Sequence, residues 1–208
     1  MLYLSAHDVY KVFFDYQQSW ERSEDCAELK HTVRGLVQGK RLAKIDVIVC
    51  FGLGPLADYW LLCPFFHAVQ KDTATGCTQH AAALTIATLL AEQDAQEKIQ
   101  EYAQDPRYRQ GDIEALKSLD IEFLNHEHGI QEGFMMVDGN TFVFSINTGN
   151  FLQQIICETN RPAAMIWSGP DPNDWEETQT FPRILYILVM EYNEYEVLGS
   201  KRRMGTRA

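Results

Sequence analysis

The sequence predicts an α/β fold built on one doubly wound, mainly parallel sheet with helices on both faces. The strongest observation is residues 45–54 (IDVIVCFGLG), where an unbroken apolar run of the kind buried in a parallel sheet leads directly into Gly52 and Gly54. The second is residues 79–90, which are apolar nearly all round, as in a helix buried against a sheet. The third is the alternation of strand and helix patterns after residue 45, which is typical of a Rossmann-like domain.

The composition predicts a single domain over residues 1–208, because 46% of the 208 residues are hydrophobic and 12% are aromatic. The formal net charge of −11 opposes long-range attraction of nucleic-acid phosphate. The 5 cysteines form no CxxC pair, a pattern typical of reduced intracellular thiols. The sequence has no signal-peptide pattern and no apolar run of about 18 residues, so we expect a soluble cytoplasmic or nuclear protein that contacts no membrane.

The first 44 residues predict an N-terminal helical segment. Ser5 and Asp8 have the spacing of a capping box, and the apolar residues that follow recur at helical spacing. We therefore expect a helix over residues 5–21. Residues 22–44 are polar and predict one short helical stretch.

Residues 55–78, which follow the glycine turn, are rich in aromatic residues and include Pro55 and Pro64. A loop of this length inside a compact domain is usually a lid or a binding loop, and the alternative is a short surface helix that covers the sheet. The helix over 79–90 comes next and leads into the remaining strands.

The rest of the chain alternates between the two periodicities. We expect strands at 99–103, 121–124, 134–137, 141–146 and 163–167, with a hairpin-type turn between 134–137 and 141–146, and helices at 111–120, 151–158 and 182–195. The last helix is amphipathic, with an apolar stripe made by Ile184, Leu188, Tyr192 and Tyr195. Residues 45–170 thus form the core, 171–200 an acidic loop and closing helix, and 201–208 a basic tail.

Polar residues gather where the predicted strands end. In open α/β sheets ligands bind outside the carboxyl ends of the strands, so we predict a crevice there for a small molecule or an amino acid. Its predicted binding residues are Gly52, Gly54, Asp105, Glu127, Asn147, Asn150 and Trp167. Two alternatives stay open: Asp105 precedes a proline and is also a typical turn former, and both asparagines suit left-handed turn positions.

The motifs for cofactors, metals and covalent catalysis are missing from the sequence. Gly52-x-Gly54 completes neither G-x-G-x-x-G nor a P-loop, so we expect no cofactor. His126 and His128 would share one face of an extended chain, but they have no thiolate or third spaced ligand beside them, so a polar loop is favoured and no metal is predicted. No G-x-S-x-G is present, and we expect Cys50 to be buried core.

Residues 171–177 (DPNDWEE) form the densest acidic patch after a predicted strand end. Carboxylates there would orient a cationic group or act as a general base. A solvated loop that caps the last helix explains the same residues.

Several of these segments together resemble the sensitivity-to-red-light-reduced family, in particular its small fungal form. The similar segments are residues 47–54, 79–86, 103–106, 126–129 and 163–167. The arginine-containing cyclodipeptide synthases are an offshoot of that family and carry an Asp-Asp-x-x-Glu motif. Residues 173–177 (NDWEE) are similar to it, with Asn173 in place of the first aspartate, so the resemblance implies Asp174 and Glu177 as catalytic residues.

Two functions follow from these observations. The resemblance implies an enzyme that makes an arginine-containing cyclic dipeptide from aminoacyl-tRNA, by aminoacyl transfer and peptide-bond formation. The alternative is a non-enzymatic regulatory or small-molecule-binding domain of the same family. The sequence predicts neither the second amino acid nor the oligomeric state.

Overall fold

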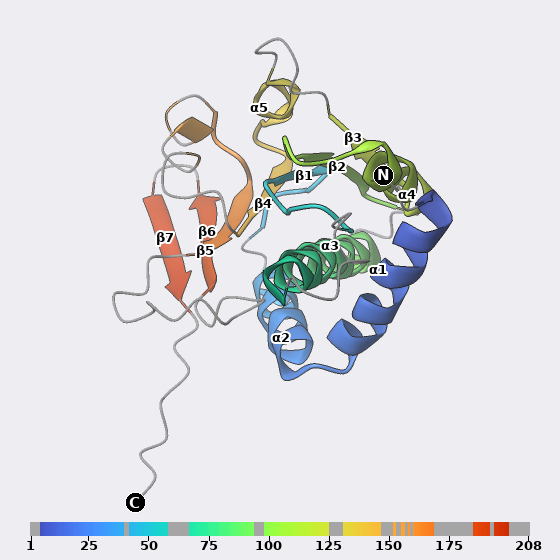
Figure 1. Ribbon diagram of the computed structural model, residues 1–208. Coiled ribbons are helices and arrows are strands. Elements are labelled where there is room, and N and C mark those ends of the chain that lie inside the picture. The colour runs from blue at the N-terminus through green and yellow to red at the C-terminus, as the bar shows by residue number, and fades with distance from the viewer. Residues whose placement is uncertain are drawn as a thin grey trace, which may run out of the picture.

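The computed structural model describes most of the chain from residue 5 to residue 199 (Figure 1). The described residues are 5–39, 42–57, 67–93, 98–124, 131–146, 152, 155–156, 158, 160–168, 185–191 and 194–199. The helices are α1 (Ala6–Glu21), α2 (Glu24–Gln38), α3 (His67–Gln93), α4 (Gln110–Ser118) and α5 (Glu132–Met136). The strands are β1 (Val47–Phe51), β2 (Gln100–Gln104), β3 (Ile121–Phe123), β4 (Thr141–Ser145), β5 (Ala164–Ser168), β6 (Leu185–Glu191) and β7 (Glu194–Gly199).

The strands form a 7-stranded sheet in the order β3-β2-β1-β4-β5-β6-β7. Strands β3 to β5 run parallel, and β6 and β7 extend the sheet antiparallel. The apolar strand β1 lies in the interior, with Cys50 opposite Ala103 of β2 on one side and Phe144 of β4 on the other. The predicted mainly parallel α/β fold is therefore confirmed.

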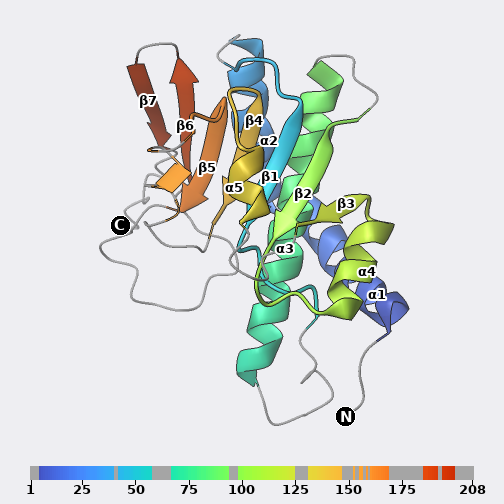
Figure 2. The same cartoon turned by 90° about the horizontal axis from the view of Figure 1, so that it is seen from above.

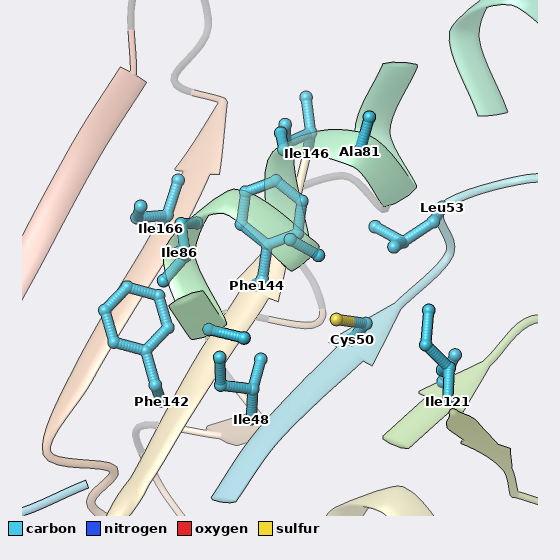
Figure 3. Packing of buried hydrophobic residues seen from close by; sticks show 14 of the residues in the cluster. Ile48, Cys50, Leu53, Ala81, Ile86, Ile121, Phe142, Phe144, Ile146 and Ile166 are labelled. Carbon is cyan, nitrogen blue, oxygen red and sulfur yellow. The ribbon is translucent and has the colours of Figure 1, made fainter. Parts of the chain in front are cut away.

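Helices cover both faces of the sheet. In Figure 1, α1, α2 and α3 lie on one side of the strands and α5 on the other, and Figure 2 shows α5 in front of the sheet with α3 behind it. The larger apolar cluster joins α1–α4 to one sheet face, including Phe142, Phe144 and Ile166 (Figure 3). The smaller cluster lies on the opposite face and contains Val143 and Ile156. Alternate residues of β4 thus point into two cores, as the period of a strand requires.

Local sequence explains the two N-terminal helices. Ser5 and Asp8 form the predicted capping box, with the Ser5 hydroxyl accepting from the Asp8 N–H at 3.3 Å. Ser23 caps α2 in the same way by accepting from the Cys26 N–H at 3.0 Å. The helix α2 has 15 residues, so the expectation of one short helical stretch over 22–44 underestimated its length.

The segment predicted as a loop or a short covering helix is helical from residue 67. There α3 begins, and it continues without a break through the predicted buried helix to Gln93. Residues 55–57 are buried, and 58–66 lie outside the described residues. Residues 67–78 are therefore helical, as the alternative expected, but they begin the 27-residue helix α3 and do not form a separate short surface helix.

Two other predicted elements are wrong. Residues 134–136 belong to helix α5 and not to a strand, and β4 pairs parallel with β1 and not in a hairpin. Asp138 and Thr141 form the turn from α5 into β4, with the Thr141 N–H donating to the Asp138 carbonyl at 3.1 Å. The predicted closing helix over 182–195 is also wrong, because residues 185–191 form β6 and pair with β5.

Candidate functional site

The turn after β1 has the backbone conformation that its glycines predict. Gly52 has φ 64° and Gly54 has φ 84°, both in the left-handed region that favours glycine. The Gly52 N–H donates to the Gln104 carbonyl at 2.9 Å, which continues the pairing of β1 with β2 by one residue. The turn therefore leaves the sheet at its carboxyl edge.

Helix α3 approaches this turn closely because residue 76 is also a glycine. A Cβ at Gly76 would lie 2.1 Å from the Pro55 carbonyl oxygen. On the other side of the turn, a Cβ at Gly54 would lie 2.9 Å from Arg107 Nη2. Because neither position has a side chain, α3 packs closely on one side of the turn and the guanidinium group of Arg107 on the other, at the carboxyl end of β1.

The Asp105 side chain hydrogen-bonds both the glycine turn and the loop that follows β2. Its side chain is buried, Oδ2 accepts from the Gly54 N–H at 2.7 Å, and Oδ1 accepts from the Arg107 N–H at 2.7 Å. Arg107 Nε lies 3.9 Å from Oδ1, and the Arg107 side chain is 55% exposed. The turn-forming role is thus observed for Asp105, and its contact with a ligand stays a prediction.

A second buried carboxyl group, which the sequence analysis missed, holds the next part of the turn. Asp112 Oδ1 accepts from the N–H groups of Leu56 and Ala57 at 3.1 and 3.2 Å, and Oδ2 accepts from the Arg109 N–H at 2.9 Å. Burial raises the pKa of Asp112, and these backbone donors oppose that rise. The sequence gives no signal for this role, since Asp112 reads only as a first-turn residue of α4.

His80 and Tyr108, also missed by the sequence analysis, connect α3 to the β2–α4 loop. His80 Nδ1 lies 2.7 Å from the Gly76 carbonyl, which can only accept, so Nδ1 carries the proton. Its Nε2 then accepts from the Tyr108 hydroxyl at 2.8 Å. Burial lowers the pKa of His80 to about 4, which keeps the ring neutral. The pair is therefore a fixed, uncharged link.

These contacts decide what the glycine turn can bind. Four of its N–H groups, those of Gly52, Gly54, Leu56 and Ala57, already donate to protein oxygens. Phosphate sites at glycine turns need such donors free, and here carboxyl oxygens accept from three of the four. The turn therefore has four fewer free donors to offer a phosphate group, and the expected absence of a cofactor stays a prediction.

The other predicted site residues are only partly described. Trp167 is near the carboxyl end of β5, opposite Ser145 of β4, and packs against the smaller core on the face away from α3. The structure thus places Gly52, Gly54 and Asp105 together and sets Trp167 apart from them across the sheet. The predicted residues Glu127, Asn147, Asn150, Asp174 and Glu177 and the histidines His126 and His128 lie outside the described residues.

The described cysteines are unsuited to nucleophilic chemistry. Cys50 is 1% exposed, as predicted for core, and Cys26 and Cys77 are also buried and free. Burial raises the pKa of the Cys50 and Cys77 thiols, which disfavours the reactive thiolate. The Cys77 thiol instead donates to the Leu56 carbonyl at 3.0 Å and so adds to the anchoring of the turn.

Comparison with known families gives the identification. The family model for the SRR1 domain (sensitivity to red light reduced) matches residues 27–202, which is most of the chain. The chain belongs to the SRR1-domain family. Neither a curated protein nor a solved structure matched it.

None of the described helices of this SRR1-domain chain is long and apolar enough to span a membrane. Among the residues that the structure describes, no group of three or more histidine, cysteine or acidic side chains is arranged to hold a metal ion.

Proposed function

We propose that this SRR1-domain chain binds a small molecule at the carboxyl edge of its sheet, between β1 and β4. The observation that carries the proposal is the reversal of strand order there. The chain leaves β1 through α3 on one face, whereas Leu152 and Ile156, in the helical segment after β4, pack on the opposite face. The two connections diverge at the switch point, which is where open α/β sheets bind ligands.

The chemistry of this edge favours a neutral or cationic ligand. Four N–H groups of the glycine turn already donate to protein oxygens, and the buried carboxyl groups of Asp105 and Asp112 accept from three of them. The exposed guanidinium of Arg107 lies beside Asp105, with Nε 3.9 Å from Oδ1. The net charge of −11 further disfavours an anion. An amino acid, an amine or an uncharged ring therefore suits the edge better than a phosphate ester.

A fragment screen followed by amide NMR would test this proposal. We expect fragments to shift the backbone signals of residues 52–54 and 144–146, at the carboxyl edge. The matched control is the opposite edge, residues 46–47 and 140–141, whose signals should stay in place. Fragments that bind only at the amino edge, or nowhere on the sheet, would contradict the proposal.

Synthesis of an arginine-containing cyclic dipeptide from aminoacyl-tRNA is a second candidate function. It is supported by the similarity of residues 173–177 to the carboxylate motif of the cyclodipeptide synthases, with Asp174 and Glu177 holding the guanidinium or the reacting amine. The chemistry needs little beyond positioning and a base, because an aminoacyl ester is already activated. The acidic net charge opposes tRNA binding.

Expression in bacteria with mass spectrometry of the medium separates the two candidates. A synthase should yield new arginine diketopiperazines, and Glu177→Gln should remove most of the product because it deletes one charge at constant size. Glu176→Gln is the matched control and should matter less. No product from the wild type, or equal product from wild type and the double variant Asp174→Asn, Glu177→Gln, would contradict the enzymatic role of these residues.

We also propose that the protein resides in the cytoplasm or the nucleus. The free, buried cysteines Cys26, Cys50 and Cys77 support a reducing compartment. Microscopy of a fluorescent fusion would test this, and a signal confined to the secretory pathway would contradict it.

A further inference from the structure

The side-chain amide of Gln79 on α3 is buried and unpaired among the residues that the structure describes. Gln79 is 0% exposed, and neither Oε1 nor Nε2 has a hydrogen-bond partner in the part of the chain that the structure describes. Leaving both ends of a buried amide unpaired is costly, because each group loses its hydration and gains nothing in return. Such an orphan group calls for a specific explanation.

The helix geometry places Gln79 on the β4 side of β1. In α3, Gly76 faces the turn after β1. His80 is rotated from Gly76 by about 40° and reaches Tyr108 on the β2 side, whereas Gln79 is rotated by about 60° in the opposite direction. Because β2 and β4 flank β1, the Gln79 side chain lies toward β4.

The position of Ile86, which lies on the same side of α3 as Gln79, supports this placement. Ile86 follows Gln79 by about two helical turns, and Figure 3 shows Ile86 beside Phe142 and Phe144 of β4. Gln79 is displaced from Ile86 by about 10 Å toward the carboxyl edge, the edge at which α3 meets Pro55. This puts the amide near Ile146, at the switch point between β1 and β4.

We propose that Gln79 recognises a neutral ring ligand through the cis-amide edge of that ring, an N–H and a C=O that point the same way. This rests on the small-molecule site proposed above and names its ligand class. A carboxamide presents one donor and one acceptor side by side, so it pairs with a group that presents the complement in the same plane. Lactam rings and nucleobases have such an edge, whereas an ordinary trans peptide points its N–H and C=O in opposite directions.

The surroundings favour an uncharged ligand over an ion. The described neighbours on this face, Ala83, Ile86 and Ile146, are buried and apolar. These three side chains offer no counter-charge, and an unpaired buried charge is far more costly than a paired amide. Pairing with a ring amide satisfies both orphan atoms of Gln79 at once.

The test is a titration followed by NMR of the Gln79 side-chain amide, with matched pairs of probes. The lactam arm compares δ-valerolactam with N-methyl-δ-valerolactam, and the nucleobase arm compares uracil with 1,3-dimethyluracil. N-methylacetamide serves as the trans control. We expect one unmethylated ring to shift the Gln79 NH₂ signals and its methylated partner to bind at least about tenfold more weakly, since the donor is gone. The arm that responds shows whether the ligand is a lactam or a nucleobase.

Gln79→Met keeps the length of the side chain and removes both polar atoms, so its fold should be at least as stable. In this variant the tenfold preference for the unmethylated ring should vanish. Rings that bind residues 52–54 and 144–146 equally well in wild type and Gln79→Met would overturn the role of Gln79 and leave the site itself standing. The absence of any shift at the carboxyl edge, with these probes or with the fragment screen, would overturn both.

Discussion

The two sides of the β1 carboxyl end differ in how completely their buried polar groups are paired. On the β2 side, Asp105, Asp112 and His80 each have at least two hydrogen bonds shorter than 3.3 Å. On the β4 side, Gln79 is equally buried and has none among the described residues. A protein stabilises its fold by pairing buried polar groups. We call the β2 side, where Asp105, Asp112 and His80 are all hydrogen-bonded, the satisfied side, and its network of hydrogen bonds the joint. We propose a binding site on the other side because the buried amide of Gln79 is unpaired there.

The largest effect on this comparison is expected from Gly76→Ala, which breaks the joint itself. The new Cβ would lie 2.1 Å from the Pro55 carbonyl oxygen, so the helix or the turn must move. We expect a loss of about 3 kcal/mol in the free energy of unfolding, measured with urea. Gly35→Ala is the matched control, because nothing lies within 4 Å of its Cβ and alanine favours a helix by about 1 kcal/mol. Equal effects of the two substitutions would show that the close approach of α3 does not matter.

Asp105→Asn tests the pairing on the satisfied side without a change of size. The aspartate accepts two backbone N–H groups at 2.7 Å, and an asparagine would turn an NH₂ group toward one of them. We expect a loss of about 2–3 kcal/mol in the free energy of unfolding. Asp46→Asn, at the exposed amino edge, should leave the melting temperature nearly unchanged. If both variants melt alike, the joint is not what holds the turn.

Glu101 sharpens the comparison, because it is a second buried group with an unpaired atom but lies within β2, away from the carboxyl edge. Burial raises its pKa to about 8, so the folded protein holds a proton that the unfolded chain releases near pH 4.5. The free energy of unfolding should therefore fall as pH rises from about 4.5 to about 8, by about 2 kcal/mol between pH 5 and pH 7.

The isosteric variant Glu101→Gln does not titrate, so its unfolding free energy should lose this slope. Urea unfolding of both proteins at pH 5 and pH 7 measures the difference. Identical slopes would mean that Glu101 is ionised in the fold. The outcome distinguishes Glu101, which can lower its burial cost by binding a proton, from Gln79, which does not titrate.

Much of the fold could be predicted because local pattern and tertiary environment agree there. The β-branched run of β1 suits a strand buried on both faces, and Ser5 and Asp8 mark the start of α1. Local pattern and tertiary environment disagree over residues 182–195. There an apolar stripe at helical spacing coincides with a continuous apolar run that suits a strand. Pairing of Met165 with Leu188 decides for the strand, and no local signal reports that pairing.

The candidate site was predictable only in its location. Glycines at 52 and 54 mark the turn, since its backbone requires a positive φ. The partners of that turn, Asp112, His80 and Gly76, come from α3 and α4 and meet only when both helices pack on the sheet. Whether a buried side chain such as Gln79 finds a partner is likewise a property of the folded interior, which the sequence does not display.

The smallest expected effect concerns His80, whose neutral state the satisfied side requires. Burial lowers its pKa to about 4, below the usual 6.5, so the unfolded chain binds a proton there before the folded protein does. Its contribution to stability is complete above pH 6.5 and is lost as pH falls toward 4, by about 1 kcal/mol between pH 6.5 and pH 5.5. Urea unfolding at these two pH values should show a smaller drop for His80→Gln, which cannot titrate, than for the wild type. Proton NMR should find the His80 Nδ1–H bonded at pH 5.5, with Nε2 unprotonated. A ring that is doubly protonated at that pH, or equal drops for the two proteins, would mean that the joint tolerates charge and that the contrast between the two sides is weaker than the hydrogen bonds indicate.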